Sequence, residues 1–247
     1  QKLILGHLGR FRNIHPRDQQ NWVSPCGYGS NVLVQEAIAA TYGMVEMIDH
    51  AIGSILDHLD ATDQRENTII VFTSDHGDMM GDHGLMLKGF MHYRGTLQVP
   101  LVISVPGQKP NRTTRLASSI DLGPTLLDLC GVQGYDGIQG YSLQPVIQDP
   151  DTSVRESVLI EDDIAPVVAS LTPIPAKTRT LVTNTHRYTR NSKREEQLVD
   201  LVADPDEREN LVETDAVARA VVIERLTDAL IAADDAARGA PVDAGYA

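Results

Sequence analysis

The chain has 247 residues, of which 42% are hydrophobic and 22% are charged, as in ordinary globular proteins. This length is sufficient for one large α/β domain, alone or with a small appendage. The formal net charge of -13 at pH 7 argues against a nucleic-acid partner, because phosphate binding needs clustered Lys and Arg. It also gives no reason to expect attraction to a membrane surface, so a bound anion would need a local group of cations.

Cysteine content and hydropathy exclude further classes. The two cysteines, Cys26 and Cys130, are too few and too far apart for a disulfide framework or a CxxC metal site. We expect each to be a small buried or half-buried residue. No apolar run approaches the about 20 residues that span a bilayer. Because the chain begins with Gln1 rather than Met, we expect that its start has been cut or processed.

The first predicted element is a long helix that begins after Ser30 and ends near residue 61. Its apolar residues recur at spacings of three, four and seven, which is typical of an amphipathic helix packed on a core. His50 and His58 fall on its polar side. The apolar positions are Val34, Ile38, Val45, Ile48, Ile52, Ile55 and Leu59.

Two strands and a short helix follow this helix. The runs "NTIIVFTS" (residues 67–74) and "VPLVISVPG" (residues 99–107) are continuously apolar and β-branched, which is typical of strands covered on both faces. The stretch "SSIDLGPTLLDLCGV" predicts a helix with Pro124 in its first turns. This order indicates an α/β fold with a mainly parallel sheet flanked by helices. In such sheets ligands collect at the carboxyl ends of strands.

After residue 150 the pattern changes to short strands separated by turns, which predicts a small antiparallel sheet. The candidates are "SVLIED", "RTLVTN", "HRYTRN" and "EQLVDL". A final helix is predicted over residues 215–236, and the Ala/Asp-rich tail over residues 232–247 is predicted to be poorly ordered. We therefore divide the chain into a domain over residues 1–150 and a small α+β subdomain over residues 151–247.

An Asp-His pair lies directly after the first predicted strand. Asp75 offers a carboxylate and His76 an imidazole, and Gly77 eases the sharp turn that would let both reach one ion. Two donors are too few for a tight divalent site, which needs at least four. The remaining ligands must therefore come from elsewhere in the fold.

Lys88 is the only Lys or Arg between Arg65 and Arg94, so it could pair with an anionic substrate beside the metal. The polar residues between it and the Asp-His pair have two readings. They could order the loop, or they could contact substrate or metal directly. These residues are Asp78, Asp82 and His83.

Several motifs occur in a fixed order along residues 30–215. They are "NTIIVFTSDHGDMMGDHGLMLKG", "HYRGTLQVPLVISVPG", "SSIDLGPTLLDLCGV", "GIQGYSLQPV", "RTLVTNTHRYTRN" and "EQLVDLVADPDERENL". Together they resemble the sulfatase family within the alkaline phosphatase superfamily. The resemblance implies an alkaline phosphatase-like fold and hydrolysis of small-molecule sulfate esters.

The resemblance also implies residue roles. Asp75 and His76 match the second pair of ligands to a divalent cation, usually calcium and in some branches manganese or magnesium. Lys88 matches the lysine that holds the sulfate and the leaving-group oxygen, and His83 is a weaker candidate for substrate contact. In this family the nucleophile is a formylglycine made within a Cys/Ser-x-Pro-x-Arg motif.

The sequence departs from the family pattern at two essential places. It contains no Cys/Ser-x-Pro-x-Arg motif, and it lacks the Asp-Asp pair that supplies the first two metal ligands. Gln98 replaces the usual Arg before Val-Pro, a milder change. We therefore expect the C-terminal portion of a sulfatase that does not turn over alone, since such groups act as a unit. An uncovered sheet edge would favour pairing with a second copy.

Two other functions are compatible with the same motifs. The Asp-His-Gly corner also serves phosphoryl transfer in the superfamily, so a phosphodiesterase or phosphonate monoester hydrolase is the first alternative. The second is a non-catalytic protein that binds anions or a partner. The sequence does not identify the substrate alcohol.

Overall fold

The computed structural model describes residues 31–86, 88, 91–165 and 175–238. The chain forms two compact units, the first comprising Gln1–Lys109 with Thr172–Ile174 and the second Pro110–Leu171 with Pro175–Ala247. This division falls near residue 110, and the predicted subdomain boundary near residue 150 stays a prediction. Cys26 lies outside the described residues.

The first unit holds one long helix, a pair of strands and a long loop that carries short helical turns. In chain order its elements are α2 (Asn31–Ala61), η2 (Arg65–Asn67), β1 (Ile70–Thr73), η3 (Asp82–Gly84), α3 (Arg94–Leu97) and β2 (Leu101–Ser104). The predicted helix and both predicted strands are present, although each strand is shorter than its apolar run. The loop between β1 and β2 contains the Asp-His pair.

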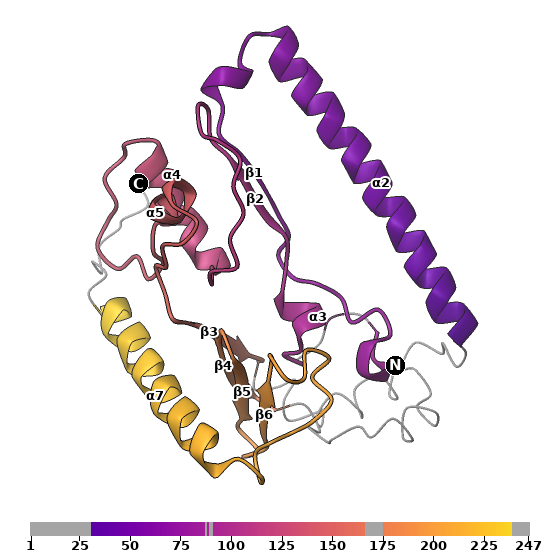
Figure 1. Cartoon of the computed structure of the whole chain (residues 1–247), viewed down its shortest axis with the longest axis vertical. Helices are drawn as coiled ribbons and strands as arrows, with labels where there is room; N and C mark the ends of the chain where they lie inside the picture. The colour runs from indigo at the N-terminus through magenta and orange to yellow at the C-terminus, as the bar shows by residue number, and fades with distance from the viewer. Residues whose placement is uncertain (1–30, 87, 89–90, 166–174, 239–247) are drawn as a thin grey trace. The chain divides into compact units, whose positions relative to one another are not determined.

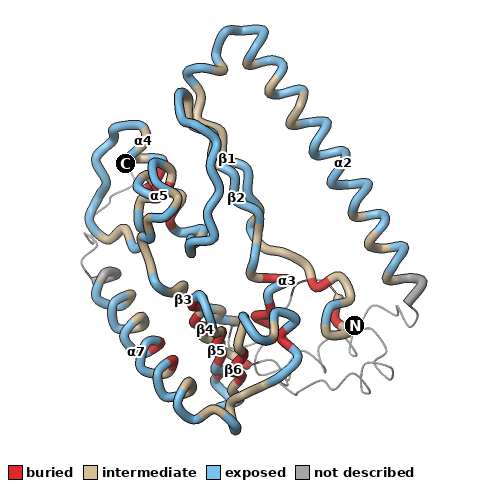
Figure 2. The backbone as a smooth tube through the Cα atoms, viewed as in Figure 1, coloured by how far each residue is buried: buried red, intermediate tan, exposed pale blue. Residues whose placement is uncertain are grey.

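Helix α2 confirms the periodicity of its sequence, but the expectation that its apolar face packs on a core is wrong. Ile48 is 53% exposed and Ile55 is 61% exposed, and Figure 2 shows most of the helix as exposed. His50 and His58 are exposed as well, as expected. The reason is that no described segment of the unit covers this face along most of its length.

Strands β1 and β2 pair with each other in an antiparallel register that matches Ile70 with Ser104 and Thr73 with Leu101. The expectation that they are covered on both faces is wrong, since Phe72 is 40% exposed and Val102 is 58% exposed. The two strands were predicted to belong to a mainly parallel sheet, but they pair antiparallel with each other, because the loop after β1 turns the chain back beside β1. The apolar runs are therefore strands without a covering layer among the described residues.

The second unit confirms the predicted small antiparallel sheet and its helix. Its first half contains η4 (Ser119–Asp121), α4 (Leu122–Leu129) and α5 (Gln144–Gln148). The four-stranded sheet has the order β3-β4-β5-β6, with each strand antiparallel to the next. Its strands are β3 (Ser157–Asp163), β4 (Lys177–Thr183), β5 (His186–Asn191) and β6 (Glu196–Asp200), and the last element is α7 (Ala216–Arg238).

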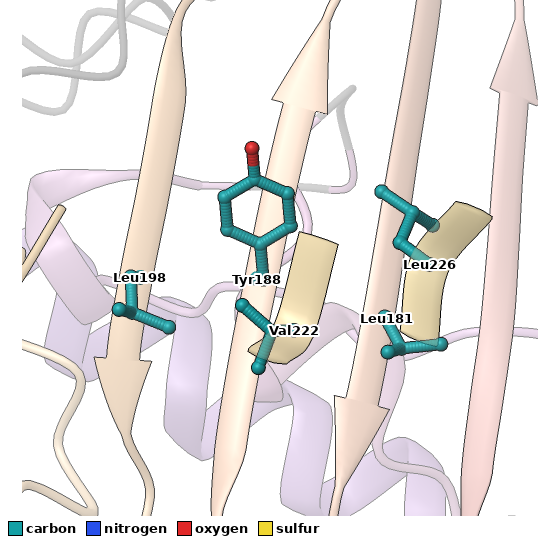
Figure 3. Packing of buried hydrophobic residues seen from close by; sticks show 5 residues of the cluster. All are labelled: Leu181, Tyr188, Leu198, Val222 and Leu226. Carbon is teal, nitrogen blue, oxygen red and sulfur yellow. The ribbon is translucent and has the colours of Figure 1, made fainter. Parts of the chain in front are cut away.

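One face of this sheet is apolar and is covered by α7 (Figure 1). Alternate residues of a strand point to the same face, and the apolar ones on β4, β5 and β6 meet one stripe of the helix (Figure 3). Burial of these side chains holds sheet and helix together. The buried cluster consists of Leu181, Tyr188, Leu198, Val222 and Leu226.

The opposite face of the sheet carries a buried ion pair. Arg187 and Glu207 are 1% and 4% exposed, and the Arg187 Nε lies 2.5 Å from the Glu207 Oε1. The guanidinium also donates to Thr189 Oγ1 and to Gln197 Oε1, each at 3.0 Å. These hydrogen bonds compensate for the removal of both charges from water.

A second buried carboxylate organises the first half of the unit. Asp121 is fully buried and accepts hydrogen bonds from the backbone N–H groups of Ser118 and Tyr141. The guanidinium of Arg155 forms an ion pair with it and lies over the Tyr141 ring. One side chain thus joins the start of α4 to two later segments.

Two further expectations are corrected here. Cys130 is exposed rather than buried, because it follows the last residue of the short helix α4. The tail was predicted to be poorly ordered from residue 232, but α7 continues to Arg238, and residues 239–247 lie outside the described residues. No helix in the described ranges is both long enough and apolar enough to cross a membrane.

The buried pair predicts a large effect on stability. Arg187→Met should lower the free energy of unfolding by about 3–5 kcal/mol, because it removes the cation that balances the buried Glu207 carboxylate. Urea unfolding followed by circular dichroism measures the change. The matched control is Arg208→Met, which removes an exposed pair with Asp206 and should cost less than about 1 kcal/mol. Equal losses in both variants would contradict the prediction.

Candidate metal centre

The corner after β1 is fixed by hydrogen bonds between adjacent residues. The Ser74 hydroxyl donates to the His76 carbonyl oxygen at 2.9 Å. The backbone N–H of His76 donates to Asp75 Oδ1 at 3.0 Å. These short-range bonds turn the chain sharply and keep the Asp75 and His76 side chains together.

Gly77 anchors this corner against α3. Its N–H donates to the Thr96 carbonyl oxygen at 2.9 Å. A Cβ atom at this position would lie 2.0 Å from the Gly95 carbonyl oxygen, so no residue other than glycine fits without movement of the backbone. The Thr96 hydroxyl in turn donates to the Met91 carbonyl oxygen at 2.7 Å. The position of the Asp-His pair therefore depends on α3.

The donor atoms of Asp75 and His76 converge. Asp75 Oδ2 lies 3.3 Å from His76 Nε2. Two ligands bound at about 2.3 Å to one cation, and at a right angle, are about 3.2 Å apart. The hydrogen bond from the His76 N–H holds the pKa of Asp75 below its usual value, so this carboxylate is ionised at neutral pH. The pair has the separation and charge of two neighbouring ligands.

Lys88 lies against the same pair. Its Nζ is 2.7 Å from His76 Nε2, while His76 Nδ1 is 2.8 Å from the Gly77 carbonyl oxygen. A carbonyl oxygen only accepts, so the ring proton is assigned to Nδ1. Nε2 then presents its lone pair to the Lys88 ammonium. The structure thus brings together the three side chains that the sequence selected.

Two of the remaining polar residues of the loop have contacts within it, and their predicted role in substrate contact stays a prediction. Asp78 Oδ1 accepts from the Met80 N–H at 2.9 Å, and the His83 ring stacks on Tyr93 with centroids 4.0 Å apart. His83 adopts a left-handed backbone with φ of 54°. Beneath the loop lies a small buried cluster of Met79, Leu85, Met91 and Tyr93.

Sequence reasoning did not select Gly95, Thr96 or Tyr93. The signal was available for Gly95, since a glycine within "HYRGTLQ" interrupts a short helical turn. Nothing in the local sequence indicated that its carbonyl would face Gly77. That contact joins residues 18 positions apart, so only the folded loop shows it.

The donors present fit two ligands of a divalent metal. Within the described ranges, no three His, Cys, Asp or Glu side chains gather in a metal-binding group. A divalent cation needs at least four donors. Asp75 and His76 could therefore supply only part of such a site, and the other donors would have to come from other residues.

Two family models match the chain. The model described as "Sulfatase" matches residues 8–132. The model described as "N-sulphoglucosamine sulphohydrolase, C-terminal" matches residues 81–235. The metal corner at residues 75–77 lies within the first match and Lys88 within both.

Known proteins agree with these matches. An arylsulfatase of Clostridium perfringens (strain 13 / Type A) is 34% identical over 188 residues, which cover 74% of this chain and 37% of that protein. The structure of BT4656 in complex with its substrate D-glucosamine-2-N,6-O-disulfate has a TM-score of 0.69 and 27% identity. The phosphonate monoester hydrolase of Agrobacterium radiobacter also has a TM-score of 0.69, with 29% identity.

Each of these two structures matches 77% of this chain and 40% of its own length. The chain thus spans about two fifths of the length of these relatives. The structural likeness confirms the alkaline phosphatase-like fold class predicted from the sequence. The sulfatase family implies a divalent metal, in agreement with the two converging donors. With one family model covering residues 8–132 and another residues 81–235, the chain belongs to the sulfatase family.

Proposed function

We propose that this chain forms part of a sulfuric ester hydrolase that acts on small-molecule sulfate esters with a divalent metal. The observation that carries the proposal is the convergence of Asp75 Oδ2, His76 Nε2 and Lys88 Nζ on one corner. A sulfate ester is an anion, and a cationic lysine beside two metal ligands suits it. The proposed activity is that of a whole sulfatase, and this chain matches 37% of the Clostridium perfringens arylsulfatase.

Asp75 and His76 would hold the metal. A bound divalent cation supplies Lewis-acid polarisation of sulfuryl oxygens and lowers the pKa of a nucleophile. Calcium is the ion that the family resemblance implies. The Asp75 carboxylate suits calcium, manganese or magnesium, and His76 would be a minority nitrogen donor to any of them. The lone pair on His76 Nε2 serves either the metal or Lys88, but not both at once.

Lys88 would bind the substrate anion when the metal occupies His76. Its ammonium is exposed and lies 2.7 Å from the ring nitrogen, so release from His76 leaves three donors beside the metal position. These donors can hold a sulfuryl oxygen and offset negative charge that develops on the leaving-group oxygen. The sequence contains no Cys/Ser-x-Pro-x-Arg motif, so we expect no nucleophile from this chain.

A phosphonate monoester hydrolase is the second candidate function. The likeness to the Agrobacterium radiobacter enzyme supports it, since its TM-score equals that of the sulfatase complex. Two ligands and a lysine do not discriminate between a sulfuryl and a phosphoryl group. Relative rates on an aryl sulfate and on an aryl phosphonate monoester separate the two candidates.

The activity test uses two proteins and two substrates. The chain alone should hydrolyse neither 4-nitrophenyl sulfate nor 4-nitrophenyl phenylphosphonate, because it lacks two metal ligands and the nucleophile. The product of the longest reading frame that contains this chain should hydrolyse the sulfate faster. Release of 4-nitrophenol measures both rates. Metal-dependent turnover by the chain alone would refute the fragment hypothesis, and a preference for the phosphonate would favour the second candidate.

Removal of one metal ligand should weaken metal binding without loss of fold. In the product of the longest reading frame that contains this chain, Asp75→Asn should reduce Mn²⁺ affinity at least about tenfold, because one charge-assisted interaction is worth about 1.5–3 kcal/mol. Isothermal titration calorimetry at pH 7 measures the affinity. Asp57→Asn, on the exposed surface of α2, is the control and should bind as the unmodified chain does. Equal affinity in the Asp75 variant would exclude it as a ligand.

The contact of Gly77 with Gly95 makes a further prediction. Gly77→Ala should displace the corner, because its Cβ would lie 2.0 Å from the Gly95 carbonyl oxygen. We expect at least about a tenfold loss of Mn²⁺ affinity, equal to about 1.4 kcal/mol. Gly53→Ala is the matched control, since no atom lies within 4 Å of its added Cβ, and in helix α2 it should be neutral or stabilising. Unchanged metal binding in Gly77→Ala would contradict the anchoring role.

A further inference from the structure

A pocket of about 330 Å³ lies in the second unit between the β4–β5 hairpin and helix α7. Three cationic side chains line it from the strands, namely Lys177, Arg179 and Arg190. Three apolar side chains line it from the helix, namely Ile223, Leu226 and Leu230. No acidic residue is among the described residues of its wall. The pocket shares no residue with the metal centre.

The strand register concentrates positive charge at the pocket. Arg179 and Arg190 are direct partners across β4 and β5, and like charges in that position repel each other. The outer partner of Arg179 is Glu161 on β3, and that of Arg190 is Glu196 on β6. The row across the sheet is therefore Glu-Arg-Arg-Glu, with both positive charges in the centre.

Arg190 is the less fully paired of the two arginines. Arg179 Nε lies 2.7 Å from Glu161 Oε1, whereas Arg190 Nε lies 3.7 Å from Glu196 Oε1. Glu196 is instead held by Arg219 of α7, whose Nε donates to its Oε2 at 2.8 Å. The Arg190 side chain is 46% exposed. Its guanidinium can therefore accept a further anion without breaking a short ion pair.

Tyr188 adds a polar group to the same wall. It lies on β5 within the apolar cluster (Figure 3), and its hydroxyl is buried near the Glu196 carboxylate. Burial, together with the nearby Glu196 carboxylate, raises the pKa of Tyr188 to about 12. The hydroxyl thus stays protonated at neutral pH, and the Glu196 carboxylate is the acceptor beside it.

We propose that this pocket binds a small amphipathic organic anion, with its negative head between Arg179 and Arg190 and its apolar body against α7. The apolar residues of the helix recur at spacings of three and four, so they form one continuous stripe. Arg179 is already paired with Glu161 and Asp163, and Lys177 is paired with Asp163. The anion would therefore pair chiefly with Arg190. The pocket volume is at the lower end of that of small-molecule sites. The proposal does not depend on the sulfatase activity of the metal centre.

Titration of the full chain with phenyl sulfate tests the proposal, by calorimetry at pH 7. We expect saturable binding at one site, at least tenfold tighter than that of inorganic sulfate or of benzyl alcohol. Inorganic sulfate has the negative charge without an apolar body, and benzyl alcohol has the apolar ring without the charge. Arg190→Gln should weaken the affinity about tenfold, as expected for one charged hydrogen bond. Arg208→Gln, which removes an exposed cation away from the pocket, should leave it unchanged.

A second variant adds a charge instead of removing one. Thr227 is exposed on α7 and lines the pocket, so Thr227→Glu should also weaken phenyl sulfate binding about tenfold while the helix remains. Val217→Glu on the same helix, where the side chain is 78% exposed, is its control. Lys88→Gln should not alter the binding, which separates this pocket from the metal centre.

Four results would overturn the proposal. The first is the absence of saturable binding of phenyl sulfate. The second is equal binding of inorganic sulfate, which would mean that the apolar stripe takes no part. The third is an unchanged affinity in both Arg190→Gln and Thr227→Glu. A loss of binding in Lys88→Gln would likewise assign the ligand to the metal centre instead.

Discussion

A backbone contact between Gly77 and α3 holds the corner that carries Asp75 and His76 in place. The Gly77 N–H donates to the Thr96 carbonyl oxygen, and the space for a Cβ is taken by the Gly95 carbonyl oxygen. Two backbone segments approach this closely only where side chains are absent. The direction of the Asp75 and His76 side chains follows from this contact, since both residues immediately precede Gly77. The chemistry of the site thus depends on two residues that carry no chemical group of their own.

The second unit is organised by buried charge and apolar packing together. The core beneath α7 supplies the apolar burial, while Arg187 with Glu207 and Arg155 with Asp121 join segments distant in sequence. Such pairs specify which segments meet, because a wrong arrangement would leave a buried charge without a partner. The same sheet carries the central Arg179 and Arg190 of the proposed anion pocket. Charged side chains therefore form ion pairs in the interior of this unit and line the proposed pocket at its surface.

Two features of the first unit are incomplete: the set of metal donors and the cover over its apolar residues. The metal corner has two donors where a divalent cation needs at least four. Helix α2 and strands β1 and β2 expose apolar residues such as Ile55 and Val102, which proteins normally bury. The chain also spans 37% of the length of the Clostridium perfringens arylsulfatase. All three observations fit a chain that supplies part of a sulfatase.

The sequence by itself determined the elements with a strong local period, namely α2, the strands of residues 157–200 and α7. It also selected Asp75, His76 and Lys88, because ligand types at a strand end are readable from adjacent letters. The tertiary structure alone decided that β1 and β2 are antiparallel, that Gly95 faces Gly77 and that Arg190 lies opposite Arg179. Local periodicity reflects the geometry of one segment. Exposure, strand direction and close backbone approach depend on which distant segments meet. The sequence of one segment does not show which other segment it contacts.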